Sequence, residues 1–180
     1  MNSRSTLGLL VFVALSHSTC KESRQPNEQS PDKARQNRVE TPNLMDDSRP
    51  VLVAEKVFFP GNKTTAMGAS PKGRYEAVFE DDGETGYFYG LDSNSEKNPI
   101  VDALHIYNAK DVTDGDRESI AQIVWSSDGL KVGLFINDYP HAVFDFERKR
   151  GYSRTNFPPP TGEFSKEGHG WSADAEKFFE

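Results

Sequence analysis

Two clusters of acidic and aromatic residues hold the side chains best suited to chemistry. The first is Glu80-Asp81-Asp82-Gly83-Glu84 with Tyr87-Phe88-Tyr89 behind it, and the second is Asn137-Asp138-Tyr139-Pro140-His141. Paired carboxylates hydrolyse glycosides when they face each other across a cleft, with the carboxyl groups roughly 5 to 9.5 Å apart. Asp81 and Asp82 are neighbours on an expected turn and point apart, which disfavours that use.

A contact surface for another protein suits these clusters better. Tyrosine supplies a large contact area at low entropic cost, and carboxylates attract a basic partner. The alternative for the two tyrosines of the first cluster is that they only cover one face of a sheet. The predicted interaction surface consists of Asp81, Asp82, Tyr87, Tyr89, Asp138, Tyr139 and His141.

Signatures of other catalytic or metal sites are missing from the sequence. No G-x-S-x-G elbow occurs, and His105, His141 and His169 stand too far apart for a short metal-binding motif, so we expect structural histidines. The acidic run 111–116 lacks the ligand spacing of a calcium loop and predicts a solvated turn. We therefore predict a protein that is not an enzyme and binds no cofactor or metal; the alternative is a small carboxylate-dependent hydrolase.

Composition predicts one folded domain in the later part of the chain. Of 180 residues, 20 are aromatic, and only Phe12 precedes Phe58. Residues 51–180 contain fourteen basic and twenty-two acidic side chains, a net charge of −8. That charge repels a phosphate backbone, so we expect no nucleic-acid partner. The one basic run, Arg148-Lys149-Arg150, is typical of a solvated strand end.

The first twenty residues have the layout of a secretory signal. Arg4 precedes the apolar run Leu7–Leu15, which is far shorter than the roughly 20 residues that span a bilayer. Cys20, the single cysteine, follows that run, and this arrangement resembles a bacterial lipoprotein signal with Cys20 as the lipidated residue. His17 and Thr19 depart from the lipoprotein pattern. The alternative is a secreted protein cleaved after Ser16.

Three segments follow from these patterns: a signal peptide at 1–20, a disordered tether at 21–49 and a β-rich domain at 50–180. The tether is polar, has balanced charge and lacks aromatic residues. In the domain, short runs rich in valine, isoleucine, phenylalanine and tyrosine alternate with turn residues. The expected strands are 51–59, 74–80, 86–91, 103–108, 120–125, 131–136 and 141–147, with a short helix near 173–179.

The expected fold class is all-β, either an antiparallel sandwich or a partial propeller of about seven strands. A turn pattern typical of propeller blades recurs at 70–75, 125–131 and 171–177. A closed propeller needs at least about four blades of roughly 40 residues, more than this domain can hold. We therefore interpret the pattern as a marker of turns.

Three stretches, 78–92, 103–108 and 123–160, resemble a bacterial family of unknown function, domain of unknown function 2251. The resemblance implies a bacterial source and transfers no catalytic residue. It supports an envelope protein, held to the membrane through Cys20 on the periplasmic side or at the outer membrane, or free in the periplasm if Cys20 is not lipidated. We expect its acidic domain to bind another envelope protein, as an inhibitor, immunity factor or accessory subunit. The remaining alternative is a module that binds carbohydrate or peptidoglycan.

Overall fold

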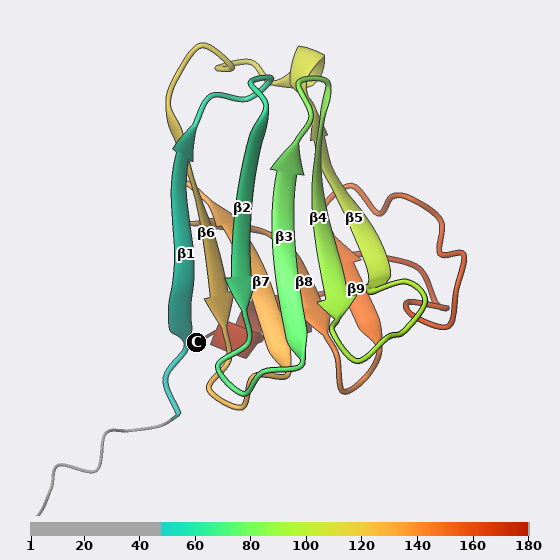
Figure 1. Ribbon diagram of the computed structural model, residues 1–180. Coiled ribbons are helices and arrows are strands. Elements are labelled where there is room, and N and C mark those ends of the chain that lie inside the picture. The colour runs from blue at the N-terminus through green and yellow to red at the C-terminus, as the bar shows by residue number, and fades with distance from the viewer. Residues whose placement is uncertain (1–47, 180) are drawn as a thin grey trace, which may run out of the picture. The chain divides into compact units, whose positions relative to one another are not determined.

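Alternating apolar and polar side chains between tight turns fold the chain into two antiparallel β-sheets (Figure 1). The computed structural model describes residues 48–179. The five-stranded sheet has the order β1 (Val51–Phe58), β6 (Ser119–Trp125), β7 (Lys131–Ile136), β8 (Tyr139–Asp145) and β9 (Arg150–Ser153). The four-stranded sheet has the order β2 (Thr64–Ala69), β3 (Tyr75–Asp81), β4 (Thr85–Asp92) and β5 (Ile100–Asn108). The helical segments are η1 (Ala109–Asp111), α1 (Ala173–Glu176) and η2 (Lys177–Phe179).

The prediction of an all-β fold is confirmed, and of its two architectures the sandwich is the one observed. All seven expected strands are present, and α1 with η2 forms the short C-terminal helix. The sequence analysis missed β2 and β9. β2 consists of small residues and one methionine, and β9 is only four residues long, so neither has a run of bulky apolar side chains. No described helix has both the length and the hydropathy of a membrane span.

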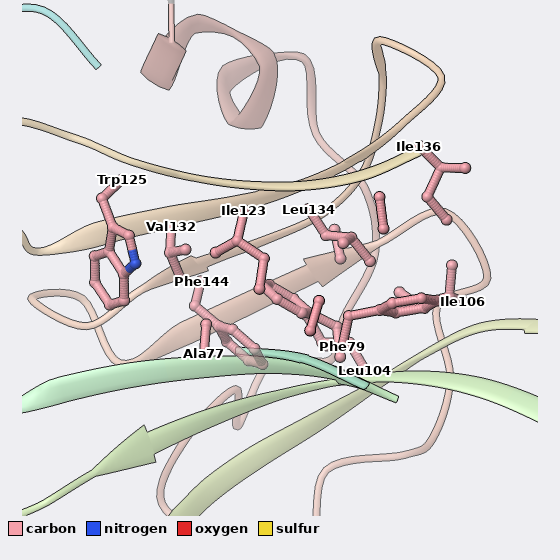
Figure 2. Packing of buried hydrophobic residues seen from close by; sticks show 14 of the residues in the cluster. Ala77, Phe79, Leu104, Ile106, Ile123, Trp125, Val132, Leu134, Ile136 and Phe144 are labelled. Atoms are coloured by element: carbon pink, nitrogen blue, oxygen red, sulfur yellow. The ribbon is translucent and has the colours of Figure 1, made fainter. Parts of the chain in front are cut away.

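The core fills the space between the sheets with one side-chain layer from each (Figure 2). Trp125, Phe79, Phe88 and Phe144 are fully buried, and the rings of Phe88 and Phe144 stack across the two sheets with their centroids 5.4 Å apart. The Trp125 Nε1–H donates to the carbonyl oxygen of Gly68 at 3.3 Å, which satisfies its polar atom inside the core.

Two copies of the recurring turn pattern pack against each other. Residues 70–74 join β2 to β3, and residues 126–130 join β6 to β7 in the other sheet. The Ser70 hydroxyl donates to the Gly129 carbonyl oxygen at 2.9 Å, and Gly129 has a left-handed φ of 71°. The pattern therefore marks turns, as expected. The third copy, at 171–177, leads into α1 instead of a hairpin.

The C-terminal segment, residues 154–172, closes one side of the sandwich. The backbone N–H of His105 on β5 donates to Phe157, and that of Ser153 on β9 donates to His169, at 2.9 and 2.8 Å. Beyond it, Ala175 packs on Val143 and Tyr152, which point away from the core of the five-stranded sheet. The C-terminal residues thus cover part of the outer face of that sheet.

Gly68 sets how closely the two sheets approach. A Cβ at this position would lie 2.4 Å from Val53 Cγ2 and 3.1 Å from Ile123 Cγ2. We predict that Gly68→Ala lowers the free energy of unfolding by about 1–3 kcal/mol, the usual cost of overpacking a core. Urea denaturation measures it. Gly162→Ala is the matched control because its nearest neighbour would be 4.0 Å away; equal effects of the two substitutions would contradict the prediction.

Candidate functional site

The structure divides the predicted interaction surface between two faces of the sandwich. Tyr87 and Tyr89 alternate with the fully buried Phe88, so they lie on the outer face of the four-stranded sheet. Tyr139 and His141 contact each other on β8 of the five-stranded sheet, near the C-terminal residues. The two predicted clusters therefore do not form one continuous site.

Asp81 lies inside the protein, so it is not part of the exposed surface to which the sequence analysis assigned it. Its side chain is 1% exposed and accepts hydrogen bonds from the Gly61 N–H, the Gly83 N–H and the Tyr107 hydroxyl, at 2.7, 2.8 and 2.6 Å. Burial, and then the bond to Asp81, raise the pKa of Tyr107. Asp81 therefore fastens the β1–β2 loop, the β3–β4 turn and β5 to one another. The sequence shows an acidic turn at this place and contains no signal that one of its acids is buried.

Asp82, by contrast, is exposed on the β3–β4 turn. Its Oδ1 accepts the backbone N–H groups of Glu84 and Thr85, both at 2.8 Å. The bonds from Thr85 and Glu84 lower the pKa of Asp82. The carboxylate is thus ionised, held in one place and open to solvent.

Cross-strand pairing builds a surface around the two tyrosines. One row of paired residues across β2, β3 and β4 consists of Thr65, Glu80 and Tyr87. The neighbouring row on the same face consists of Met67, Val78 and Tyr89. We call this surface the tyrosine face: Thr65, Met67, Val78, Glu80, Tyr87 and Tyr89, with Asp82 at the adjacent turn.

The tyrosine face combines exposed apolar area with negative charge. The rings of Tyr87 and Tyr89 stack with centroids 5.9 Å apart, and Met67 is 58% exposed. Partial burial, then the charge of Glu80 and its hydrogen bond, raise the pKa of Tyr89, with smaller contributions from Tyr87 and Asp82. In Figure 1, no described segment crosses in front of β2, β3 and β4.

The second predicted cluster surrounds Arg154. Its guanidinium carbon lies 3.6 Å from the Trp171 ring centroid and 4.8 Å from that of Tyr139, and an ion pair joins it to Glu176. Burial, and then the charge of Arg154, lower the pKa of His141 to about 4. Asp138 is an exposed turn residue with a left-handed φ of 63°. The cluster attaches the C-terminal residues to β8, and sequence reasoning missed Arg154 and Trp171 as its members.

The sequence analysis also missed a partly buried polar group centred on Asp102. Asp102 Oδ2 accepts the Ser165 hydroxyl at 2.5 Å and His169 Nε2 at 2.9 Å, while His169 Nδ1 donates to the Pro158 carbonyl oxygen at 2.6 Å. Burial opposes a charge on His169, but Asp102 outweighs it and the pKa of His169 is raised. Although serine, histidine and aspartate meet here, the serine bonds the aspartate, so this is not a nucleophile–base pair.

The described side chains do not form a cluster with metal-binding geometry. Within residues 48–179, no three histidine, cysteine or acidic side chains gather closely enough to hold an ion. Cys20 lies outside the described residues. Apart from the buried Asp81, the residues of the predicted interaction surface thus fall on one exposed acidic and aromatic surface and in a group that attaches the C-terminal segment to β8, and the Asp102 group is a second such attachment.

The family model described as "Uncharacterized protein conserved in bacteria (DUF2251)" matches residues 58–180. The chain belongs to this family. The DUF2251 match is longer than the resemblance noted in the sequence and includes every strand from β2 to β9. An uncharacterized protein of Haemophilus influenzae is 46% identical over 110 residues, which cover 61% of this chain and 68% of that relative. No solved structure matches the chain. The DUF2251 description names no activity.

The opposite pKa shifts of two histidines predict a stability maximum close to pH 6.5. Between pH 4 and 6.5 the unfolded chain protonates His141 and the folded protein does not, so stability rises with pH. Above pH 6.5 the folded protein keeps the proton on His169 longer than the unfolded chain, so stability falls as pH rises through the folded-state pKa.

Urea unfolding at intervals from pH 4 to pH 9 measures both limbs of this profile. His141→Gln should flatten the acid limb and His169→Gln the alkaline limb. An unchanged profile in both variants would show that other groups control the pH dependence.

Proposed function

We propose that this DUF2251 protein is a non-enzymatic binding domain of the bacterial cell envelope that presents its tyrosine face to a basic protein partner. The partner class agrees with an inhibitor or immunity factor acting on a basic wall-attacking enzyme, or with an accessory subunit of an envelope assembly. The observation that carries the proposal is the open outer face of the four-stranded sheet, where stacked tyrosines and Met67 lie beside exposed carboxylates.

The negative charge of the tyrosine face and of the whole folded region favours a basic partner. Glu80 and Asp82 are exposed, and the folded region has a net charge of −8. Such a field speeds encounter with a cationic surface and penalises an anionic one. The tyrosine rings then supply most of the affinity, because aromatic anchors dominate interface energetics.

Position-specific photocrosslinking in the native bacterium tests the surface. A photoreactive phenylalanine analogue replaces Met67 on the tyrosine face and, as a control, Lys110 in η1 at the end of β5. We expect one protein adduct from position 67 and none from position 110. Adducts of equal yield at both positions would contradict the proposal. The absence of an adduct at position 67, together with retention of the protein on purified peptidoglycan, would also contradict it and would favour a wall-binding module.

Neutralising the exposed acids tests the charge argument on the partner so identified. The double variant Glu80→Gln with Asp82→Asn should weaken binding by about 2- to 30-fold, from roughly 0.2–1 kcal/mol per exposed ion pair. Asparagine retains the Oδ1 acceptor that holds the turn, so the fold is preserved. Calorimetric titration at low and high salt measures the loss.

The matched control, Glu55→Gln with Glu147→Gln, removes two exposed charges from the five-stranded sheet and its turns. We expect this control to bind as the wild type does. Tyr89→Ala should cost about 30-fold or more, as an interface anchor does. If the affinity is the same at low and high salt and is unchanged in the Glu80→Gln with Asp82→Asn variant, the electrostatic part of the proposal is wrong.

Attachment to the envelope membrane through Cys20 is the second part of the proposal. The short apolar run before a lone cysteine supports it. We predict that the wild type sediments with membranes and incorporates labelled fatty acid, whereas Cys20→Ser incorporates none. Fractionation and label detection check this, and equal labelling of the two proteins would refute a lipid on Cys20.

A further inference from the structure

A cleft opens at the end of the sandwich where β3 and β5 begin and β4 ends. Its volume is about 290 Å³, and Tyr75, Val101, Phe146 and Phe164 line it. The Tyr75 and Phe146 rings stack with centroids 4.2 Å apart, and Phe164 meets Phe146 edge-on at 6.0 Å. Aromatic rings of the core therefore form an apolar floor that reaches the surface.

A second cleft of about 440 Å³ shares Lys149 and Glu163 with the first. Together the two are lined by five cationic side chains and three carboxylates. The cations are Arg74, Arg148, Lys149, Arg150 and Lys166, and the carboxylates are Asp92, Glu163 and Glu167. Within a region of net charge −8, this joined cleft is a local positive site.

The three carboxylates are already paired. Asp92 binds Arg74, Glu163 binds Lys166 and Glu167 binds Arg150. Lys149 forms no ion pair with any described residue. Its charge adds to the effect of Lys166 in lowering the pKa of Glu163. These pairings leave Lys149 and the neighbouring Arg148 as the available cations.

Arg148 has only a distant partner. Its Nε lies 3.9 Å from Asp145 Oδ2, which is buried beneath it and does not line either cleft, and the Arg148 side chain is 64% exposed. An anion at the mouth of the cleft can therefore be reached by both Arg148 and Lys149 without breaking an ion pair of normal length.

Size and chemistry together identify a ligand class. A cavity of roughly 150 Å³ holds a benzene molecule, so the aromatic cleft accommodates one substituted ring. Ligand sites commonly join such an apolar floor to a few charged groups that fix orientation. We propose that the joined cleft binds a compact aromatic carboxylate, with its ring on Tyr75, Phe146 and Phe164 and its carboxylate at Lys149 and Arg148. A free small molecule and the C-terminal residue of a peptide both carry this chemistry.

Titration of the full chain with 3-phenylpropionate, followed by amide NMR shifts, tests the proposal. We expect saturable shifts centred on Val101, Lys149 and Phe164, with a Kd on the order of 1 mM or tighter. The neutral 3-phenylpropionamide and the ringless butyrate should each bind about tenfold more weakly. Absence of saturation at about 20 mM, or equal binding of the amide, overturns the proposal.

Two tripeptides separate the sources of the carboxylate. Gly-Gly-Phe with a free C-terminus is compared with its C-terminal amide. Tighter binding of the free peptide than of 3-phenylpropionate identifies a peptide end as the ligand, and weaker binding identifies a free small molecule. Both outcomes support the site, whereas equal binding of the peptide and its amide contradicts it.

Reversing the charges of Arg148 and Lys149 tests whether the ligand carboxylate binds at these two residues. Arg148→Glu with Lys149→Glu should weaken 3-phenylpropionate binding at least about tenfold, because both residues are exposed and their charges would then repel the carboxylate. Since Arg148 also faces the buried Asp145, Lys149→Glu alone, which breaks no ion pair with a described residue, should weaken binding in the same direction. Lys110→Glu, beyond the opposite end of β5, is the matched control and should leave the Kd unchanged. An unchanged Kd in the double variant overturns the site. The cleft shares no residue with the tyrosine face, so either proposal can fail without the other.

Discussion

The partly buried carboxylate of Asp102 connects the two sheets at their edge strands, β5 and β9, which have no further described strand beside them. It lies on β5, and through Ser165 and His169 it holds the segment that also bonds the backbone of β5 and β9. Cys20 is the single cysteine of the chain, so no disulfide can perform this role. A hydrogen bond to a charged group contributes more than a neutral one, and leaving either partner buried alone is costly. The edge closure of the sandwich therefore depends on this ionic group.

That closure makes the two outer faces unequal. The C-terminal residues lie against the five-stranded sheet through Ala175 and Trp171, whereas the four-stranded sheet leaves Met67 largely exposed. The acidic and aromatic surface is on the uncovered side, and the cationic cleft is at one end of the strands. A small domain thus separates surfaces of opposite charge.

The sequence predicted the fold class because strand periodicity and turn residues are local signals. Residues 131–136 alternate clearly, and Asp128-Gly129 marks the turn before them. β2 escaped prediction because its small residues, Gly68 above all, are required by contact with Val53 and Ile123 from the other sheet. Such a requirement is tertiary and leaves no periodic pattern.

The candidate site was predictable only in part, for the same reason. Tyr87 and Tyr89 could be assigned to one sheet face from their alternation with Phe88. The burial of Asp81 could not be predicted from the sequence, because it arises from contacts with Gly61 and Tyr107, which are 20 and 26 residues away. The cationic cleft joins residues from five separated parts of the chain, so the basic run 148–150 alone resembles an ordinary strand end.

The order in which the strands are connected has a consequence for how the protein is made. β1 pairs with β6, and the Gln122–Glu55 bond joins residues 67 apart; His169 and Asp102 are also separated by 67 residues. Contacts of such long sequence separation form late, because each must first close a long loop. The growing chain cannot pair β1 until β6 has been synthesised, nor bond Asp102 to its partners until residues 165–169 have been added. The sandwich can therefore complete its fold only after residue 169 has been added to the growing chain.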